Sequence, residues 1–249
     1  MIRAVVHGAE GRMGRMVADL LGTAPDVELC GLVTEPDSPG LQQRKEDGPA
    51  LIGQDQMARS LPAGAVIVDF SLAAATEGLL SAAEALSAPL VIGTTGHTPD
   101  QLSALREYSQ RQPVVLASNF SVGIPALRML LQLLARILPG EFDAAELETH
   151  HVTKLDRPSG TALSLANAYA EARRTDPPPI LSQRLGGVVG EHTWTFSDQE
   201  ETLVLTHRAH SRRAFLRGVL PAVRFVSGRE NGFYELQDVL MALSPGGQA

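Results

Sequence analysis

The stretch that decides the fold of this 249-residue chain is residues 2–14, Ile2-Arg3-Ala4-Val5-Val6-His7-Gly8-Ala9-Glu10-Gly11-Arg12-Met13-Gly14. Residues 2–7 form the short apolar run typical of a β-strand. The residues Met13, Val17, Leu20 and Leu21 recur at the spacing of one helix face. A strand, a glycine-rich turn and a helix in this order open a βαβ unit that cradles phosphates, so the sequence predicts a Rossmann-like fold.

The glycines of this turn are spaced Gly-x-x-Gly-x-x-Gly, one residue off the usual Gly-x-Gly-x-x-Gly. Gly8 suits a tight turn, Gly11 a close approach of the backbone to a pyrophosphate, and Gly14 the packing of the helix on the strand. A second strand, residues 27–33, ends beside Glu35, about 20 residues beyond the glycines, where an acid accepts hydrogen bonds from an adenosine ribose. This placement favours a dinucleotide over a glycine-rich turn without a cofactor.

Apolar strands and helical stretches alternate along the first half of the chain, which is typical of a doubly wound parallel sheet covered on both faces. The expected strands are residues 65–70, 89–93 and 113–117, and the expected helices are residues 73–86 and 99–109. Ligands bind beyond the carboxyl ends of such strands. The turns found there suit a nicotinamide–ribose pocket, although each is also compatible with ordinary turn chemistry: Asp69-Phe70-Ser71, Gly93-Thr94-Thr95-Gly96 and Ala117-Ser118-Asn119-Phe120-Ser121. The polar residues 36–49 predict a mobile loop near the adenine end.

The pattern changes after Asn119. Residues 124–138 are apolar almost all round, which predicts a helix buried between layers or between subunits. Strand-like runs at 142–149, 192–196 and 202–207 predict an open, largely antiparallel sheet with helices on one side, whose edges subunit association could cover. A helical stretch from Arg213 through Val226 follows, and a final segment is expected to return to the first domain.

These elements predict an α/β protein with two domains. Residues 1–121 and 213–249 are expected to form a Rossmann-like dinucleotide-binding domain with a doubly wound parallel sheet. Residues 122–212 are expected to form an α+β domain for substrate binding and oligomerisation.

Residues 150–161, His150-His151-Val152-Thr153-Lys154-Leu155-Asp156-Arg157-Pro158-Ser159-Gly160-Thr161, combine two imidazoles, an ammonium group and a helix start. Pro158 disfavours helix at the preceding residue, and Ser159 can cap the helix that follows. The first amides of that helix lack intrahelical partners and suit a carboxylate or phosphate. Lys154 can hold a carboxylate and supply a proton, and His150 can titrate near neutral pH. The segment therefore fits an anionic substrate that must receive a proton.

Each part of this segment also has a structural explanation, since Ser-Gly-Thr before an alanine-rich run is an ordinary capped helix and adjacent histidines can be surface residues. A zinc site is disfavoured, because no second ligand cluster lies nearby in the sequence and Lys154 would repel a cation. In an extended strand His150 and Lys154 lie about 13 Å apart, so the chain must turn after His151 for both to touch one small ring.

Composition limits the classes of partner. The net charge of −7 gives no basic footprint for nucleic acid, and the lone Cys30 excludes an internal disulfide framework. No stretch approaches the roughly 20 apolar residues of a membrane span. Met1-Ile2-Arg3 leads directly into the first strand without a signal peptide. We expect a cytoplasmic protein with no nucleic-acid or membrane partner.

Over essentially its whole length the chain resembles the 4-hydroxy-tetrahydrodipicolinate reductase family, also called dihydrodipicolinate reductase, of the bacterial lysine and diaminopimelate pathway. The run HHxxKxDxPSGTA is the most specific part of the resemblance. The residues that carry it are 8–15, 93–96, 117–123, His150-His151 with Lys154, 158–162, and Val189-Gly190-Glu191-His192-Thr193.

The resemblance implies reduction of 4-hydroxy-tetrahydrodipicolinate to tetrahydrodipicolinate with NADH or NADPH, and a homotetramer joined through the sheets of the second domain. It implies that His150 is the catalytic acid/base, that Lys154 is the proton donor, and that His151, Lys154, Gly160 and Thr161 bind the carboxylates of the small dicarboxylate substrate. The implied cofactor contacts are Gly8, Ala9, Glu10, Gly11, Arg12, Met13, Glu35, Gly93, Thr94, Thr95, Ala117, Ser118, Asn119 and Phe120; no metal is implied.

Two residues depart from the family pattern. Arg157 stands where alanine usually precedes Pro-Ser-Gly-Thr, and Pro36 follows Glu35 where an arginine often appears. That arginine would hold a 2′-phosphate, whereas Glu35 suits a free 2′-hydroxyl, although Arg12 can still reach a phosphate. We expect use of both cofactors with a preference for NADH.

Two other functions stay open at this point. Another two-domain dehydrogenase of an amino-acid pathway, such as a relative of homoserine dehydrogenase, could share the first domain. A dinucleotide-sensing regulator without catalysis is the non-enzymatic alternative.

Overall fold

The structure, a computed structural model, describes residues 1–42 and 48–243. It divides into two compact units, Met1–Phe120 with Leu216–Ala249 (unit 1) and Ser121–Phe215 (unit 2), whose boundaries differ by a few residues from those expected. Part of the expected loop at 36–49 lies outside the described residues, and within the rest Pro39–Gln42 forms a short 3-10 helix. No helix of the described segments is both long and apolar enough to cross a membrane.

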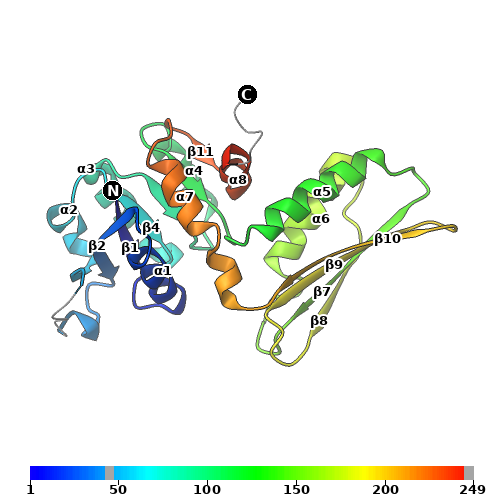
Figure 1. The fold of residues 1–249 in the computed structure, drawn as a ribbon, viewed down its shortest axis with the longest axis horizontal. Helices are drawn as coiled ribbons and strands as arrows, with labels where there is room; N and C mark the ends of the chain where they lie inside the picture. The colour runs from blue at the N-terminus through cyan, green and yellow to red at the C-terminus, as the bar shows by residue number, and fades with distance from the viewer. Residues whose placement is uncertain (43–47, 244–249) are drawn as a thin grey trace. The chain divides into compact units, whose positions relative to one another are not determined.

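Unit 1 contains a parallel sheet in the order β11-β6-β5-β4-β1-β2-β3 (Figure 1). The strands are β1 (Ile2–His7), β2 (Val27–Thr34), β3 (Leu51–Gly53), β4 (Val66–Asp69), β5 (Leu90–Ile92), β6 (Val114–Leu116) and β11 (Phe233–Tyr234). The five strands expected from apolar runs are confirmed. The two edge strands β3 and β11 were not expected, because two or three residues are too few to show a period.

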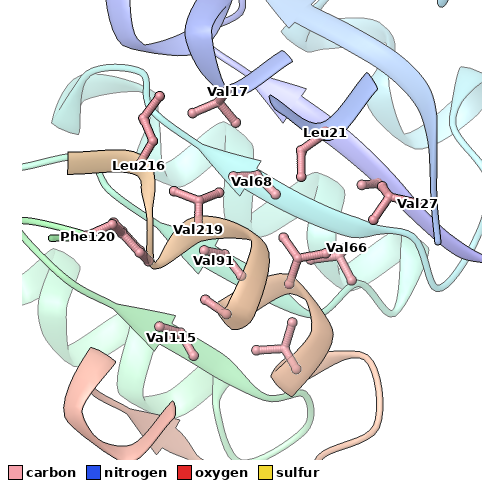
Figure 2. Close-up of a cluster of buried hydrophobic side chains, with 14 of the residues drawn as sticks. Val17, Leu21, Val27, Val66, Val68, Val91, Val115, Phe120, Leu216 and Val219 are labelled. Carbon is pink, nitrogen blue, oxygen red and sulfur yellow. The ribbon is translucent and has the colours of Figure 1, made fainter. Parts of the chain in front are cut away.

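Helices cover both faces of this sheet, because alternate strand residues point to opposite sides. In β1, Ala4 and Val6 join one buried cluster with α1 and α7, whereas Val5 joins the other with α3 and α4. Figure 2 shows Val17 and Leu21 of α1 near Val66 and Val68 of β4. The helices are α1 (Arg12–Gly22), α2 (Met57–Ser60), α3 (Thr76–Leu86), α4 (Pro99–Tyr108), α7 (Val219–Val226) and α8 (Leu236–Leu243). The doubly wound arrangement is confirmed.

The C-terminal part of the described chain returns to unit 1, as expected. β11 pairs in parallel with β6, and Leu236 and Val239 of α8 are buried in the α1/α7 cluster. The helical stretch expected from Arg213 is interrupted: a 3-10 turn, Arg212–Leu216, ends before Gly218. A Cβ atom at Gly218 would lie 2.8 Å from the carbonyl oxygen of Phe120, so the backbones approach too closely there for a larger residue.

Unit 2 is a four-stranded sheet in the order β10-β9-β7-β8 with α5 (Gly123–Ile137) and α6 (Gly160–Arg173) on one face (Figure 1). The strands are β7 (Asp143–His150), β8 (Ile180–Arg184), β9 (Gly190–Ser197) and β10 (Thr202–Ala209). The pairs β7–β9 and β9–β10 are antiparallel, whereas β7–β8 is parallel. The sheet is therefore largely antiparallel, as expected, but β8 was not foreseen.

Helix α5 differs from the expectation of a helix buried on all sides. Leu127 and Leu131 are buried in the unit 2 core, whereas Leu130, Leu133 and Ile137 are 47%, 50% and 61% exposed. Within the described residues of unit 2 the helix is covered on one side, where α6 and the sheet pack against it. Burial against another subunit stays a prediction.

Candidate functional site

The chain turns sharply directly after β7. The amide of Lys154 donates to the carbonyl of His151 at 3.1 Å, which closes the turn that the sequence required. Arg184, the last residue of β8, holds the next residues: its Nε donates to the carbonyl of Lys154 at 3.1 Å, and its guanidinium also donates to the carbonyl of Asp156. The bend after His151 is therefore fixed to the neighbouring strand.

His150 lies at the end of β7 with its ring orientation set by a carboxylate. Its Nδ1 hydrogen-bonds to Glu148, which lies on the same face because side chains alternate along a strand. Burial lowers the pKa of His150 below its ordinary value, although the charge of Glu148 opposes this effect. Near neutral pH the imidazole is thus a neutral, oriented group whose Nε2 is the atom left for acid–base chemistry.

Glu148 and Arg184 complete this arrangement, and the sequence analysis missed both. Arg184 Nη1 lies 2.9 Å from Glu148 Oε1, and both side chains are almost fully buried. Burial alone would raise the pKa of Glu148, but Ser182, Arg184 and His150 together hold it below its usual range. Glu148 could have been predicted from its position two residues before His150, which puts both side chains on one face of the strand. Arg184 could not have been predicted, because β8 was not expected.

Lys154 already binds a carboxylate in this structure, that of Asp156. Lys154 Nζ lies 2.8 Å from Asp156 Oδ1, and the hydrogen bond and the charge of Lys154 lower the pKa of Asp156. Because the Asp156 side chain is 54% exposed, the pair is weak and can open. One of the groups expected to bind substrate, Lys154, thus already contacts a carboxylate.

Helix α6 begins with the serine cap that the sequence predicts. Ser159 is the N-cap of α6, and its Oγ accepts a hydrogen bond from the amide of Ala162 at 3.2 Å. The first turn carries no acidic residue, and no atom lies within 4 Å of a Cβ built at Gly160. The first amides of α6, including those of Gly160 and Thr161, have no acceptor within the helix and lie at its positive end. His151, also expected to bind substrate, has its Nδ1 2.7 Å from Thr153 Oγ1.

The glycine turn of unit 1 has a backbone geometry that suits an anion. Gly8 has a φ of +78°, and a Cβ there would lie 2.6 Å from the carbonyl oxygen of Phe70. A Cβ at Gly14 would collide with the backbone of Gly8, so the helix packs directly on the turn. Gly11 caps α1 without a side-chain hydrogen bond, and no acid lies in the first turn. The geometry fits a pyrophosphate at the free amides of α1.

The side chains of this turn point in different directions. Ala9 and Met13 pack into the unit 1 core, so only their backbones can face a ligand, whereas Arg12 is exposed. Glu10 Oε2 accepts hydrogen bonds from Thr34 Oγ1 at 2.7 Å and from Ser38 Oγ. These two hydroxyls, Ser38 foremost, lower the pKa of Glu10. Its carboxylate is thus held at the end of β2, next to the exposed Glu35.

A polar network joins the ends of β1, β4 and β5. Asp69 Oδ1 lies 2.8 Å from His7 Nδ1 and accepts from Ser71 Oγ at 2.6 Å. The amide of Ser71 donates to Thr94 Oγ1 at 2.9 Å, so the Thr94 hydroxyl holds the turn. Sequence reasoning placed Asp69 in a turn suited to a nicotinamide–ribose pocket and assigned no role to His7. The remaining expected cofactor contacts lie at the ends of β5 and β6. At the end of β5, Gly93 lies against the Phe70 ring and Thr95 is exposed. At the end of β6, Ser118 is exposed, Ala117 and Asn119 are half-buried, and Phe120 is buried.

Among the residues that the structure describes, no group of three or more His, Cys, Asp or Glu side chains could hold a metal ion.

Two family models cover the chain: dihydrodipicolinate reductase, N-terminus, matches residues 2–120, and dihydrodipicolinate reductase, C-terminus, matches residues 123–240. The chain belongs to the dihydrodipicolinate reductase family. The resemblance expected from the sequence is thereby confirmed.

Individual relatives agree with this membership of the dihydrodipicolinate reductase family. The 4-hydroxy-tetrahydrodipicolinate reductases of Syntrophus aciditrophicus (strain SB) and Xanthomonas euvesicatoria pv. vesicatoria (strain 85-10) are 36% and 38% identical, each over 96% of this chain and 98% of the relative. The structure of dipicolinate-bound dihydrodipicolinate reductase from Paenisporosarcina sp. TG-14 superposes with a TM-score of 0.80 at 23% identity, over 94% of this chain and 97% of that one. The last comparison shows a shared fold.

Proposed function

We propose that this protein reduces 4-hydroxy-tetrahydrodipicolinate to tetrahydrodipicolinate with NADH or NADPH, a step of lysine and diaminopimelate biosynthesis. Unit 1 binds the dinucleotide, and unit 2 binds the substrate. The observation that carries the proposal is the carboxylate of Asp156 on Lys154 Nζ, shortly before the start of α6 and a few residues after an oriented imidazole. A substrate with two carboxylates whose ring must receive a proton needs a cation, a helix start and an imidazole close together in this way.

The substrate carboxylates bind at the two cationic positions of unit 2. Lys154 and His151 hold one carboxylate, once the exposed Asp156 side chain gives way. The amides of Gly160 and Thr161 at the start of α6 hold the other, where the helix dipole favours an anion. Both binding groups follow the same bend, so they suit a small ring with two carboxylates.

The reaction needs a hydride and a proton as well as loss of the 4-hydroxyl group. Elimination of water gives a conjugated ring, and the reduced nicotinamide, when bound, supplies the hydride to ring C4. Lys154 donates a proton from Nζ to the resulting enamine, and His150 acts as acid and base through Nε2. Glu148 keeps His150 in one orientation, because it holds Nδ1.

The cofactor contacts proposed in unit 1 are the backbone of residues 8–13, Glu35, and the turns at Gly93–Thr95 and Ala117–Phe120. The carboxylates of Glu10 and Glu35 at the end of β2 favour a free ribose hydroxyl over a 2′-phosphate, which supports a preference for NADH. The exposed Arg12 leaves NADPH usable. A kcat/KM much higher with NADPH than with NADH would contradict this preference.

We also propose a homotetramer joined through unit 2, in the cytoplasm. The face of the sheet opposite the Trp194 and Phe196 side chains is not covered by α5 or α6. Leu181 and Val204 on that face are 57% and 52% exposed. Sedimentation of the purified protein tests the subunit number, and a monomer at micromolar concentration would refute the assembly.

The activity is tested by oxidation of NADH or NADPH by purified protein that is given freshly generated 4-hydroxy-tetrahydrodipicolinate. The expected result is turnover that planar pyridine-2,6-dicarboxylate inhibits. Turnover of homoserine instead would favour the other dehydrogenase, and NADH binding without any turnover would favour a regulator. Either result would overturn the proposal.

A further inference from the structure

The face of β7 that carries Glu148 and His150 has a second acid–imidazole pair, which the proposed reaction does not use. Glu146 lies two residues before Glu148, and His192 of β9 lies opposite Glu148 in the strand register. His192 Nδ1 is 2.8 Å from Glu146 Oε1, and the two side chains are 4% and 0% exposed. Two buried carboxylate–imidazole pairs therefore lie side by side on one face of the sheet.

The two pairs are in contact through their rings. The imidazoles of His150 and His192 meet edge to face, with centroids 5.4 Å apart and planes at 77°. Gly190, two residues before His192, leaves room beside the reactive end of His150, since a Cβ there would lie 3.2 Å from Nε2. Glu148 thus fixes one edge of the His150 ring, His192 contacts the ring, and Gly190 keeps Nε2 uncrowded.

The charges around His150 come from every neighbouring strand. On β8, Arg184 balances the carboxylate of Glu148, which leaves Glu146 to be balanced by His192 on β9. The cation Lys154 follows β7, and His207 of β10 lies beside His192 on its far side. A buried carboxylate must be neutralised by a partner or a proton, and burial raises the pKa of Glu146. The hydrogen bond between His192 Nδ1 and Glu146 Oε1 holds one proton between the two groups.

We propose that Glu146 and His192 are positioning residues for His150: their shared proton places a positive edge against the His150 ring and keeps that ring neutral, with Nε2 open to exchange a proton with the substrate. This inference rests on the proposed role of His150 in catalysis. It assigns a function to His192, which the family resemblance contained without a role, and to Glu146, which it did not contain.

The test is the substitution His192→Asn, because the Asn amide can still donate to Glu146 but does not titrate. Labelled-histidine NMR of the protein without ligands measures the pKa of His150 directly. We expect it to rise by about one unit, since a positive neighbour at this distance is removed. The acid limb of the kcat/KM profile then moves to higher pH by the same amount, because activity needs neutral His150.

The matched control is Phe196→Leu, on the same strand and the same sheet face and equally buried. It should lower stability while leaving both the pKa of His150 and the pH profile unchanged. Equal profiles for H192N, F196L and the unchanged protein would mean that His192 is only structural, and would overturn the inference.

A second variant, Glu146→Gln, keeps the inference testable if H192N does not fold. Without the carboxylate the buried His192 ring no longer keeps the shared proton, so the pKa of His150 should rise in this variant too; an unchanged value would refute the inference. The NMR titration needs no turnover. Absence of substrate reduction would therefore defeat the proposed function without deciding the role of the pair.

Discussion

At the residue scale, the clearest feature is that Asp156 occupies a carboxylate position. Its side chain binds Lys154 Nζ, the group proposed to hold a substrate carboxylate. Asp156→Asn should remove this internal competitor and lower the Kd of pyridine-2,6-dicarboxylate about two- to fivefold, the range expected for an exposed ion pair. Calorimetric titration measures the change. Weaker binding in D156N would instead show that the carboxylate supports the bend.

Lys154 itself is expected to act in both binding and proton transfer. Lys154→Ala should lower kcat about 100-fold or more, the usual contribution of a positioned acid, while the Kd of NADH hardly changes. Steady-state kinetics and fluorescence titration of NADH separate the two effects. Full activity in K154A would refute the assigned role.

At the scale of elements, features encoded by local sequence motifs could be predicted, whereas the pairing of strands could not. The glycine turn, the Ser159 cap and the strands with long apolar runs were all foreseen, because each is a local pattern in the sequence. The strand β8 alternates half-buried and exposed residues, so it lacks an apolar run. Arg184 of β8 and His192 of β9 reach β7 through pairings across the sheet, which no local pattern encodes. The buried charge network was therefore missed.

Two glycines of α1 provide a test of the phosphate turn. Gly14→Ala places a methyl group against the backbone of Gly8, so the variant should lose stability and bind NADH more weakly. Gly22→Ala on the same helix meets no atom within 4 Å and should gain up to about 1 kcal/mol of unfolding free energy. Thermal unfolding and NADH titration distinguish them. Equal stability and equal NADH affinity of G14A and G22A would contradict the close packing of the turn.

The caps of α6 and α4 form a second matched pair. Ser159→Ala and Thr98→Ala each remove a side-chain acceptor at a helix N-terminus, and each should cost about 1 kcal/mol of stability. Only S159A should also weaken pyridine-2,6-dicarboxylate, because only α6 is proposed to bind the substrate. Denaturant unfolding and ligand titration provide the two readouts. An equal loss of ligand affinity in T98A would argue against a local anion site.

At the scale of the whole molecule, the half-buried His207 makes the stability of unit 2 depend on pH. Burial lowers the pKa of His207 below its ordinary value of 6.5, so protonation favours the unfolded chain as the pH falls below that value. His207→Gln should therefore flatten the loss of stability between about pH 7.5 and about pH 5.5. The only tryptophan, Trp194, is buried in unit 2 and reports its unfolding in urea. If the stability of H207Q and of the unchanged protein fell equally with pH, the lowered pKa of His207 would be contradicted.

The central claim is that residues 150–161 of unit 2 bind the dicarboxylate while unit 1 binds the dinucleotide. A crystal structure of the protein with NADH and pyridine-2,6-dicarboxylate tests this most directly. The account predicts one carboxylate on Lys154 in place of Asp156, the other at the Gly160 and Thr161 amides, and the pyrophosphate at the start of α1. A dicarboxylate bound away from residues 150–161 would contradict it.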